Sequence, residues 1–179
     1  MRKKVLGPLL SLTMLVALWG PARSYGAEQG LSVGYGFAAF NAHTNVGRIE
    51  GGKDYDFFQL AYIYEMPFWK KASIVAEPFV AAVNRPNSGF DGGFDLLGRW
   101  YPFKIGASRL FLDAGAGLAY TTIKFEEQGT HFLGVLTGGV GLRYKNFFIE
   151  DRIRHYSNGH TSYPNRSVDA NIISVGMYF

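Results

Sequence analysis

The chain ends in the stretch Ile173-Ser174-Val175-Gly176-Met177-Tyr178-Phe179. Large apolar residues occupy every second position of this stretch, and an aromatic residue closes it. Successive side chains of a β-strand point to opposite faces, so the apolar residues from Ile173 to Phe179 share one face. Such a face, ending in an aromatic residue, is typical of a lipid-facing strand in a transmembrane β-barrel. The C-terminus therefore predicts a membrane barrel.

The same alternation recurs towards the N-terminus. Leu31, Val33 and Tyr35 alternate with smaller residues, and a similar pattern begins at Phe58 and Leu60. No segment after the first 26 residues holds an apolar run long enough for a membrane-spanning helix. We predict an all-β fold, an eight-stranded antiparallel transmembrane β-barrel of outer-membrane type. The expected strands cover about residues 30–40, 55–65, 72–83, 93–102, 108–120, 131–144, 147–157 and 168–179.

The lengths of the connections support this strand count. Short links follow the second, fourth and sixth strands, at residues 66–71, 102–107 and 145–146. Longer polar links are expected after the first, third, fifth and seventh strands, as at 41–52 and 158–167. Outer-membrane barrels have short periplasmic turns and longer external loops, so the same pattern predicts the orientation. A soluble β-sandwich would share the alternation of residues but does not explain the alternation of loop lengths.

The N-terminus has the features of a secretory signal. A basic head at residues 2–4 precedes an apolar stretch over residues 5–19, which is short for a membrane span. Small residues stand at the −3 and −1 positions of a cleavage site before Ala27. We predict a signal peptide at 1–26 and a barrel domain at 27–179, with an uncleaved anchor as the alternative.

Charge and cysteine content exclude several classes of protein. The signal segment holds four basic and no acidic residues, so its removal leaves 14 Lys and Arg against 14 Asp and Glu. The basic isoelectric point therefore belongs to the leader, and no nucleic-acid partner is expected. The chain has no cysteine, which excludes disulfides and thiolate metal sites.

Charged residues on the second face of the strands are expected inside the barrel. A barrel of this size is filled by side chains, which argues against a porin. We therefore predict a structural network of ion pairs in the interior. Its expected members are Glu77, Asp95, Arg99, Asp113, Arg143, Glu150, Arg152 and Arg154.

Polar residues on the lipid-facing parity stand out against this pattern. Counting back from Phe179 in steps of two reaches Asn171 and then Asp169. In the preceding strand the outward parity continues into His155 and Ser157. Polar groups that face hydrocarbon are costly, so they indicate function. The two strands are antiparallel neighbours, which brings these groups together at the external rim of one hairpin.

This combination of side chains suits acyl transfer. A histidine can take the proton of a serine hydroxyl while a carboxylate fixes the tautomer of the imidazole. His155 and Ser157 are two residues apart on a strand, so they point to the same side with Cα atoms about 6.5 Å apart. From the residues alone, rim groups that merely contact lipid headgroups remain an alternative.

The run Arg154-His155-Tyr156-Ser157-Asn158, followed by Pro164-Asn165 and Asp169, resembles the C-terminal signature of the PagL family of lipid A 3-O-deacylases. The motif covers only about the last 30 residues, but the leader, the eight strands and the terminal Phe179 agree with the family along the chain. The resemblance implies hydrolysis of the acyl ester at position 3 of lipid A, with lipopolysaccharide as substrate among outer-membrane lipids. It implies no metal and no cofactor.

The resemblance also implies the roles of individual residues. Ser157 becomes the nucleophile, His155 the general base and Asp169 the orienting acid. Asn158 matches a position whose side-chain amide helps to hold the oxyanion. Two departures bear on this assignment. The usual acid in the family is Glu, which is one methylene longer than Asp169. Two residues after Asn158, the family often has a Gly that supplies a backbone donor, whereas this chain has His160.

Other polar residues are assigned no catalytic role. His43 and His131 are expected to be solvated in or beside external loops, and no histidines stand at metal-ligand spacing. Asp151 has the lipid-facing parity, and a β-bulge in this strand is one feature that could turn it elsewhere. A non-enzymatic adhesion barrel and an inactive family member are the alternative functions. The oligomeric state, including a homodimer, is left open.

Overall fold

The structure is a computed structural model. It describes residues 26–38, 48–49, 53–125, 128–165 and 167–179. The predicted signal peptide lies outside the described residues except for Gly26, and His43 lies outside them too.

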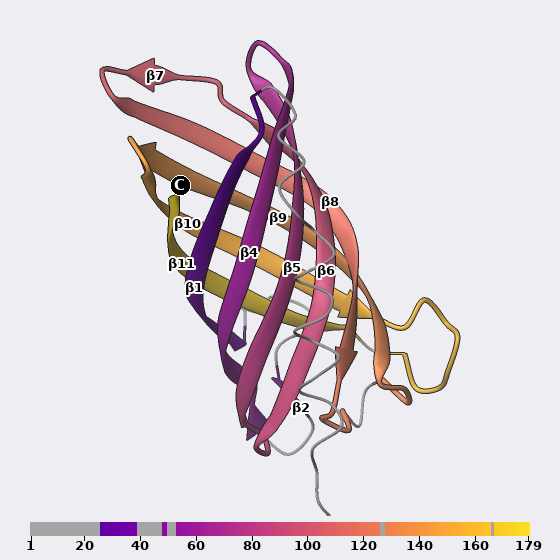
Figure 1. Cartoon of the computed structure of the whole chain (residues 1–179). Helices are drawn as coiled ribbons and strands as arrows, with labels where there is room; N and C mark the ends of the chain where they lie inside the picture. The colour runs from indigo at the N-terminus through magenta and orange to yellow at the C-terminus, as the bar shows by residue number, and fades with distance from the viewer. Residues whose placement is uncertain (1–25, 39–47, 50–52, 126–127, 166) are drawn as a thin grey trace, which may run out of the picture.

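Eight long antiparallel strands form a closed barrel (Figure 1). The long strands are β1 (Glu28–Ala38), β4 (Asp56–Trp69), β5 (Ala72–Arg85), β6 (Gly89–Trp100), β8 (Ser108–Thr121), β9 (Phe132–Tyr144), β10 (Phe147–Ser157) and β11 (Val168–Tyr178). The short strands are β2 (Arg48–Ile49), β3 (Lys53–Asp54) and β7 (Lys104–Ile105). The long strands follow the order β6-β5-β4-β1-β11-β10-β9-β8, and pairing of β6 with β8 closes the sheet. The predicted fold and strand count are confirmed.

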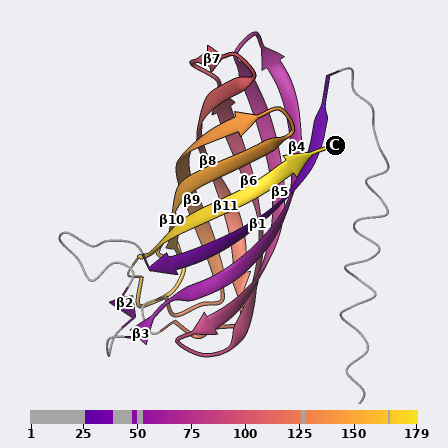
Figure 2. The same ribbon diagram turned by 90° about the vertical axis from the view of Figure 1, so that its left-hand side faces the viewer.

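The first and last strands of the barrel pair with each other. β1 and β11 run antiparallel from Gly30 opposite Tyr178 to Ala38 opposite Ala170. Figure 2 shows the two strands side by side across the wall. The Phe179 N–H donates to the Gln29 carbonyl over 2.9 Å, so the C-terminal residue completes the seam.

Most of the described connections are short or long as predicted. At one end, two-residue turns at 70–71 and 145–146 join β4 to β5 and β9 to β10, and the 101–107 link contains β7. At the other end, ten residues separate β8 from β9 and β10 from β11. The expectation of a long link after the third strand is wrong. Only residues 86–88 separate β5 from β6, because β6 begins at Gly89, where it pairs with Val83, and β5 extends to Arg85, which pairs with Asp56 of β4.

The outer surface of the wall is apolar. Ile173, Val175, Met177 and Phe179 are all exposed, as their parity predicts. At the end with the short turns, exposed aromatic residues form a belt around the wall. This belt comprises Phe68, Trp69, Trp100, Phe103, Tyr144 and Phe147. Aromatic belts of this kind lie at the headgroup level of a membrane.

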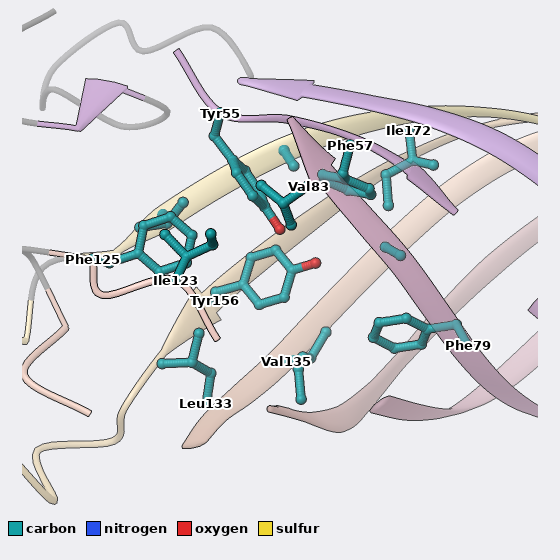
Figure 3. Packing of buried hydrophobic residues seen from close by; sticks show 14 of the residues in the cluster. Tyr55, Phe57, Phe79, Val83, Ile123, Phe125, Leu133, Val135, Tyr156 and Ile172 are labelled. Atoms are coloured by element: carbon teal, nitrogen blue, oxygen red, sulfur yellow. The ribbon is translucent and has the colours of Figure 1, made fainter. Parts of the chain in front are cut away.

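Two apolar clusters fill the ends of the interior. The larger one, at the end with the long loops, includes Tyr55, Phe57 and Tyr156 (Figure 3). The smaller one includes Phe111 and Phe148. Ring packing of this density needs glycine on the facing strand. A Cβ at Gly36 would come within 2.1 Å of the Phe57 ring, for example.

A network of ion pairs lies between the clusters. Along β10 the inward residues run from Phe148 through Glu150, Arg152 and Arg154 to Tyr156. The Arg152 guanidinium lies 2.6 Å from Glu77 and 2.9 Å from Glu150, and Arg99 lies 2.6 Å from Asp113. All eight residues of the predicted network are buried. The predicted interior is thus confirmed.

Candidate active site

The external end of β10 alternates between buried anchors and half-buried polar groups. Arg154 and Tyr156 point into the barrel and are buried, and Asn158, the first residue after the strand, is buried too. His155 and Ser157 lie between them on the opposite face and are half-buried. The period of two along the strand produces this division, because each outward residue is flanked by two inward ones.

The inward neighbours hold this part of the strand in place. The Arg154 guanidinium donates to Gln59 and to Asp95, each over 2.7 Å, and lies 4.1 Å from the centroid of the Phe79 ring. The Tyr156 ring packs edge-on against Tyr55 within the larger apolar cluster (Figure 3). The backbone on both sides of His155 is therefore fixed from inside the barrel.

His155 and Asp169 form a charge-assisted hydrogen bond on the outer surface. The two residues are directly opposite each other in the β10–β11 register, where Cβ atoms lie about 4.5–5.5 Å apart. The distance from Nδ1 of His155 to Oδ1 of Asp169 is 2.6 Å. The shorter acid therefore reaches the imidazole. Because a carboxylate only accepts, Nδ1 carries the proton and Nε2 is the basic nitrogen.

Ser157 lies beside an open patch of the wall. Its partner in the β9–β10 register is Gly134, which has no side chain on the shared outward face. A Cβ at Gly134 would approach no atom closer than the Ser157 carbonyl oxygen, at 3.5 Å. Within the described residues, no hydrogen bond joins the Ser157 hydroxyl to His155. Catalytic hydrogen bonds are often long before substrate binds.

The loop after Ser157 has a tight, braced backbone. Gly159 and His160 both adopt left-handed conformations, with φ of 59° and 64°. His160 therefore keeps a conformation that glycine would adopt without strain. The Asn158 N–H donates to Oδ1 of Asn165 over 2.9 Å, and the His160 N–H donates to Oδ1 of Asn158 over 2.9 Å.

The Asn158 amide faces into this loop. Its Nδ2 lies 3.0 Å from the carbonyl oxygens of Ser162 and Pro164, and it also contacts the carbonyl of Gln128. In this conformation the amide hydrogens are committed to carbonyl groups. The oxyanion role of the Asn158 side chain stays a prediction. These contacts involve two separate loops, and no periodic pattern in the sequence signals them.

Asp151 faces outward, and no β-bulge in β10 turns it elsewhere. The β10–β11 register is unbroken from Phe147 to Tyr156, with Asp151 opposite Ile173. Asp151 is exposed, and Nδ2 of Asn171 donates to its Oδ1 over 2.8 Å. Diagonal pairing across the strands thus partly satisfies two polar groups on the lipid-facing wall. The parity of each residue is visible in the sequence, but their contact depends on the register.

His131 is exposed, and its ring nitrogen Nδ1 lies 2.8 Å from the Thr121 carbonyl oxygen. Within the described ranges, no group of three or more His, Cys, Asp or Glu residues is arranged to hold a metal ion. The same part of the chain contains no helix that is long and apolar enough to cross a membrane.

Solved structures with a similar fold are outer-membrane proteins. The crystal structure of the outer membrane enzyme PagL is similar with a TM-score of 0.65 at 15% identity, over 83% of this chain and 98% of that chain. The outer membrane protein OprG from Pseudomonas aeruginosa is similar with a TM-score of 0.47 at 14% identity, over 86% of this chain and 96% of that chain. The Yersinia pestis outer membrane protein Ail has a TM-score of 0.47 at 15% identity, over 86% and 99%.

Sequence comparison identifies the family. No curated protein matches the chain. The family model of lipid A 3-O-deacylase (PagL) matches residues 56–178. The match covers most of the chain and includes His155, Ser157, Asn158 and Asp169. The chain therefore belongs to the PagL family of lipid A 3-O-deacylases, hydrolases of the outer membrane.

Proposed function

We propose that Ser157, His155 and Asp169 are the catalytic triad that hydrolyses the 3-linked acyl ester of lipid A in lipopolysaccharide. The observation that carries the proposal is the 2.6 Å contact between His155 and Asp169 on the lipid-facing wall. Ser157 lies on the same face of the same strand, two residues further towards the external loops. A substrate that diffuses within the outer leaflet would meet this face of the barrel from the side.

The first half of the reaction forms an acyl-enzyme. Nε2 of His155 takes the proton of the Ser157 hydroxyl as Oγ attacks the ester carbonyl carbon. Asp169 holds the imidazole in the required tautomer and stabilises the imidazolium that forms. The tetrahedral intermediate then expels the sugar oxygen at position 3, which takes the proton from His155. Lipid A leaves without that acyl chain.

The second half releases the fatty acid. Water attacks the acyl carbonyl while His155 takes one of its protons, and the second intermediate expels Ser157 Oγ. His155 returns the proton to Ser157, and the acyl chain leaves as a free carboxylic acid. Each half uses the same base and restores it, so no cofactor is consumed.

The turn after Ser157 is suited to hold the negative oxygen. In the described part of the chain, the N–H of Gly159 has no hydrogen-bond partner, whereas the amides of Asn158 and His160 are bonded to side-chain oxygens. A free backbone N–H next to a nucleophile is the kind of donor that stabilises an oxyanion. In this proposal Gly159 supplies a donor, and Asn158 either supplies a second one or shapes the turn that presents it.

The test compares single substitutions in the purified barrel. Ser157→Ala and His155→Ala should each lower release of the 3-linked acyl chain by about 10³-fold or more, measured by mass spectrometry of lipid A. Ser162→Ala is the matched control, because that hydroxyl lies in the same loop but donates to the Gly129 carbonyl. Circular dichroism and the heat-dependent gel shift report whether each barrel is folded. Full activity in folded Ser157→Ala would contradict the proposal.

Two further measurements belong to this proposal. Residues 1–26 are a signal peptide, so intact-mass measurement of the exported protein should place its N-terminus at Ala27. Chemical cross-linking of the protein in native membranes distinguishes a homodimer from a monomer.

A further inference from the structure

Exposed cations gather at the end of the barrel that lies farthest from Ser157. They belong to the turn between β4 and β5, the link that contains β7, and the turn between β9 and β10. We call this group the basic rim. It consists of Lys70, Lys71, Lys104, Arg109 and Lys145. All are exposed except Arg109, which is half-buried.

Backbone contacts join the three segments into one surface. The Tyr101 N–H donates to the Lys71 carbonyl over 2.8 Å, and Nζ of Lys71 lies 3.4 Å from the Pro102 carbonyl oxygen. The Lys145 N–H lies 3.4 Å from the carbonyl oxygen of Ala107. Figure 1 shows β7 and the β4–β5 turn at the same end of the barrel. The cations therefore lie on a continuous edge.

Aromatic rings contact two members of this edge, with Arg109 4.7 Å from the centroid of the Tyr101 ring and Nζ of Lys145 5.4 Å from that of Tyr144, but neither contact supplies a negative charge. Lys104 is directly opposite Arg109 in the β7–β8 register, and Arg109 is directly opposite Arg143 in the β8–β9 register. Like charges in such positions are destabilising. Arg143 has its own acid, with two contacts of 2.6 and 2.7 Å to Glu28. Among the described residues, no carboxylate forms an ion pair with any member of the basic rim.

The basic rim lies on the periplasmic side of the barrel, next to the aromatic belt. Short turns and the C-terminal Phe179 lie at this end, which is the periplasmic side of an outer-membrane barrel. The aromatic belt, which includes Trp69, Trp100 and Phe103, lies beside the cations. Because such belts lie at the headgroup level, cations next to them lie at the depth of lipid phosphates.

We propose that the basic rim binds the anionic headgroups of phospholipids in the periplasmic leaflet. The phosphate diester of such a lipid has no ammonium group beside it, so the headgroup carries a net negative charge that can pair with the cations, while its acyl chains lie along the apolar wall. The mature chain is formally neutral, with 14 basic and 14 acidic residues. The positive charge of the basic rim is thus a local concentration of cations and not a consequence of a net positive charge on the mature chain. This lipid site lies at the opposite end from the lipid A site and does not depend on it.

The test uses nanodiscs that contain equal amounts of phosphatidylglycerol and phosphatidylcholine. Lipids that stay on the barrel after its release are identified by native mass spectrometry. Wild-type protein should retain phosphatidylglycerol several-fold over phosphatidylcholine, and the preference should fall as salt is raised. The triple variant Lys71→Gln/Lys104→Gln/Lys145→Gln should lose the preference.

The controls separate this surface from general electrostatics. Lys124→Gln removes an exposed cation at the external end and should leave the lipid preference unchanged. The triple variant should deacylate lipid A in detergent at the wild-type rate, which shows that it is folded. Equal retention of both lipids by the wild type would overturn the proposal. That result is also the one expected if the basic rim binds an acidic periplasmic protein instead of lipid. An unchanged preference in the triple variant would overturn it too.

Discussion

Nδ1 of His155 lies 2.6 Å from Oδ1 of Asp169, and the two residues are directly opposite each other across β10 and β11. The strand register therefore brings the Asp169 carboxylate within hydrogen-bond distance of the imidazole without the extra methylene of a glutamate. Moving Asp169 by one residue along β11 would turn its side chain into the barrel. Reach is set by strand pairing, so the shorter side chain is sufficient at this position.

We expect Asp169→Asn to lower deacylation by about 10³–10⁴-fold, because an amide can accept from His155 or donate to it and no longer fixes the tautomer. The rate of acyl-chain release from lipid A is the measurement. Asp169→Glu is the control and should retain measurable activity, since it keeps the charge. Asn and Glu variants of equal activity would show that the carboxylate does not orient His155.

A bulky residue beside Ser157, the proposed nucleophile, should block access of lipid A to the site. Gly134→Leu places a side chain on the outward face opposite Ser157, and we expect kcat/KM to fall about 10-fold or more while the barrel stays folded. Gly92→Leu is the matched control, an outward glycine on β6 whose added Cβ would meet the nearest atom at 3.5 Å. Similar losses in both variants would indicate a general effect on the wall.

Removal of one partner of the buried ion pair between Asp95 and Arg154 should destabilise the barrel more than removal of both. Asp95→Leu leaves the buried Arg154 guanidinium without its carboxylate, 2.7 Å away in the native protein, and should lower the free energy of unfolding by about 3–5 kcal/mol. Asp95→Leu/Arg154→Met should recover most of that loss. Urea unfolding in lipid vesicles measures both. If the double variant were as unstable as the single one, packing rather than charge would explain the effect.

The outward pair Asp151 and Asn171 should cost stability. Their hydrogen bond of 2.8 Å leaves one carboxylate oxygen and the amide oxygen facing lipid. Asp151→Ile/Asn171→Ile should raise the free energy of unfolding by about 1–3 kcal/mol in vesicles. Deacylation should stay at the wild-type level, because among the described residues no hydrogen bond or ion pair joins either residue to His155, Ser157 or Asp169. A loss of activity with a folded barrel would assign the pair a role in catalysis.

The sequence could predict which face of a strand each residue occupies, because side chains alternate between the two faces. The period of two in β11, anchored by Phe179, correctly places its apolar residues outside the barrel. The same counting brings His155, Ser157 and Asp169 to one face of one hairpin. Ion pairs inside the barrel follow from the opposite parity. Each of these results depends only on which side of a strand a residue occupies.

Contacts that depend on register or loop conformation could not be predicted. The bond between Asp151 and Asn171 is diagonal, so it requires the offset of β10 against β11. The bonds of Asn158 require a turn with a left-handed residue at His160, where the sequence has no glycine. The length of the β5–β6 link depends on how far each of the two strands extends, which composition does not indicate.

The filled interior determines how this enzyme could be inhibited. Aromatic clusters at both ends and the buried pairs of Arg152 and Arg154 occupy the space that a channel blocker would need. A drug that enters the lumen from water would therefore have to displace these side chains of the described barrel. An effective inhibitor would have to be an amphiphile that partitions into the outer leaflet, where its potency would follow its concentration in the lipid phase.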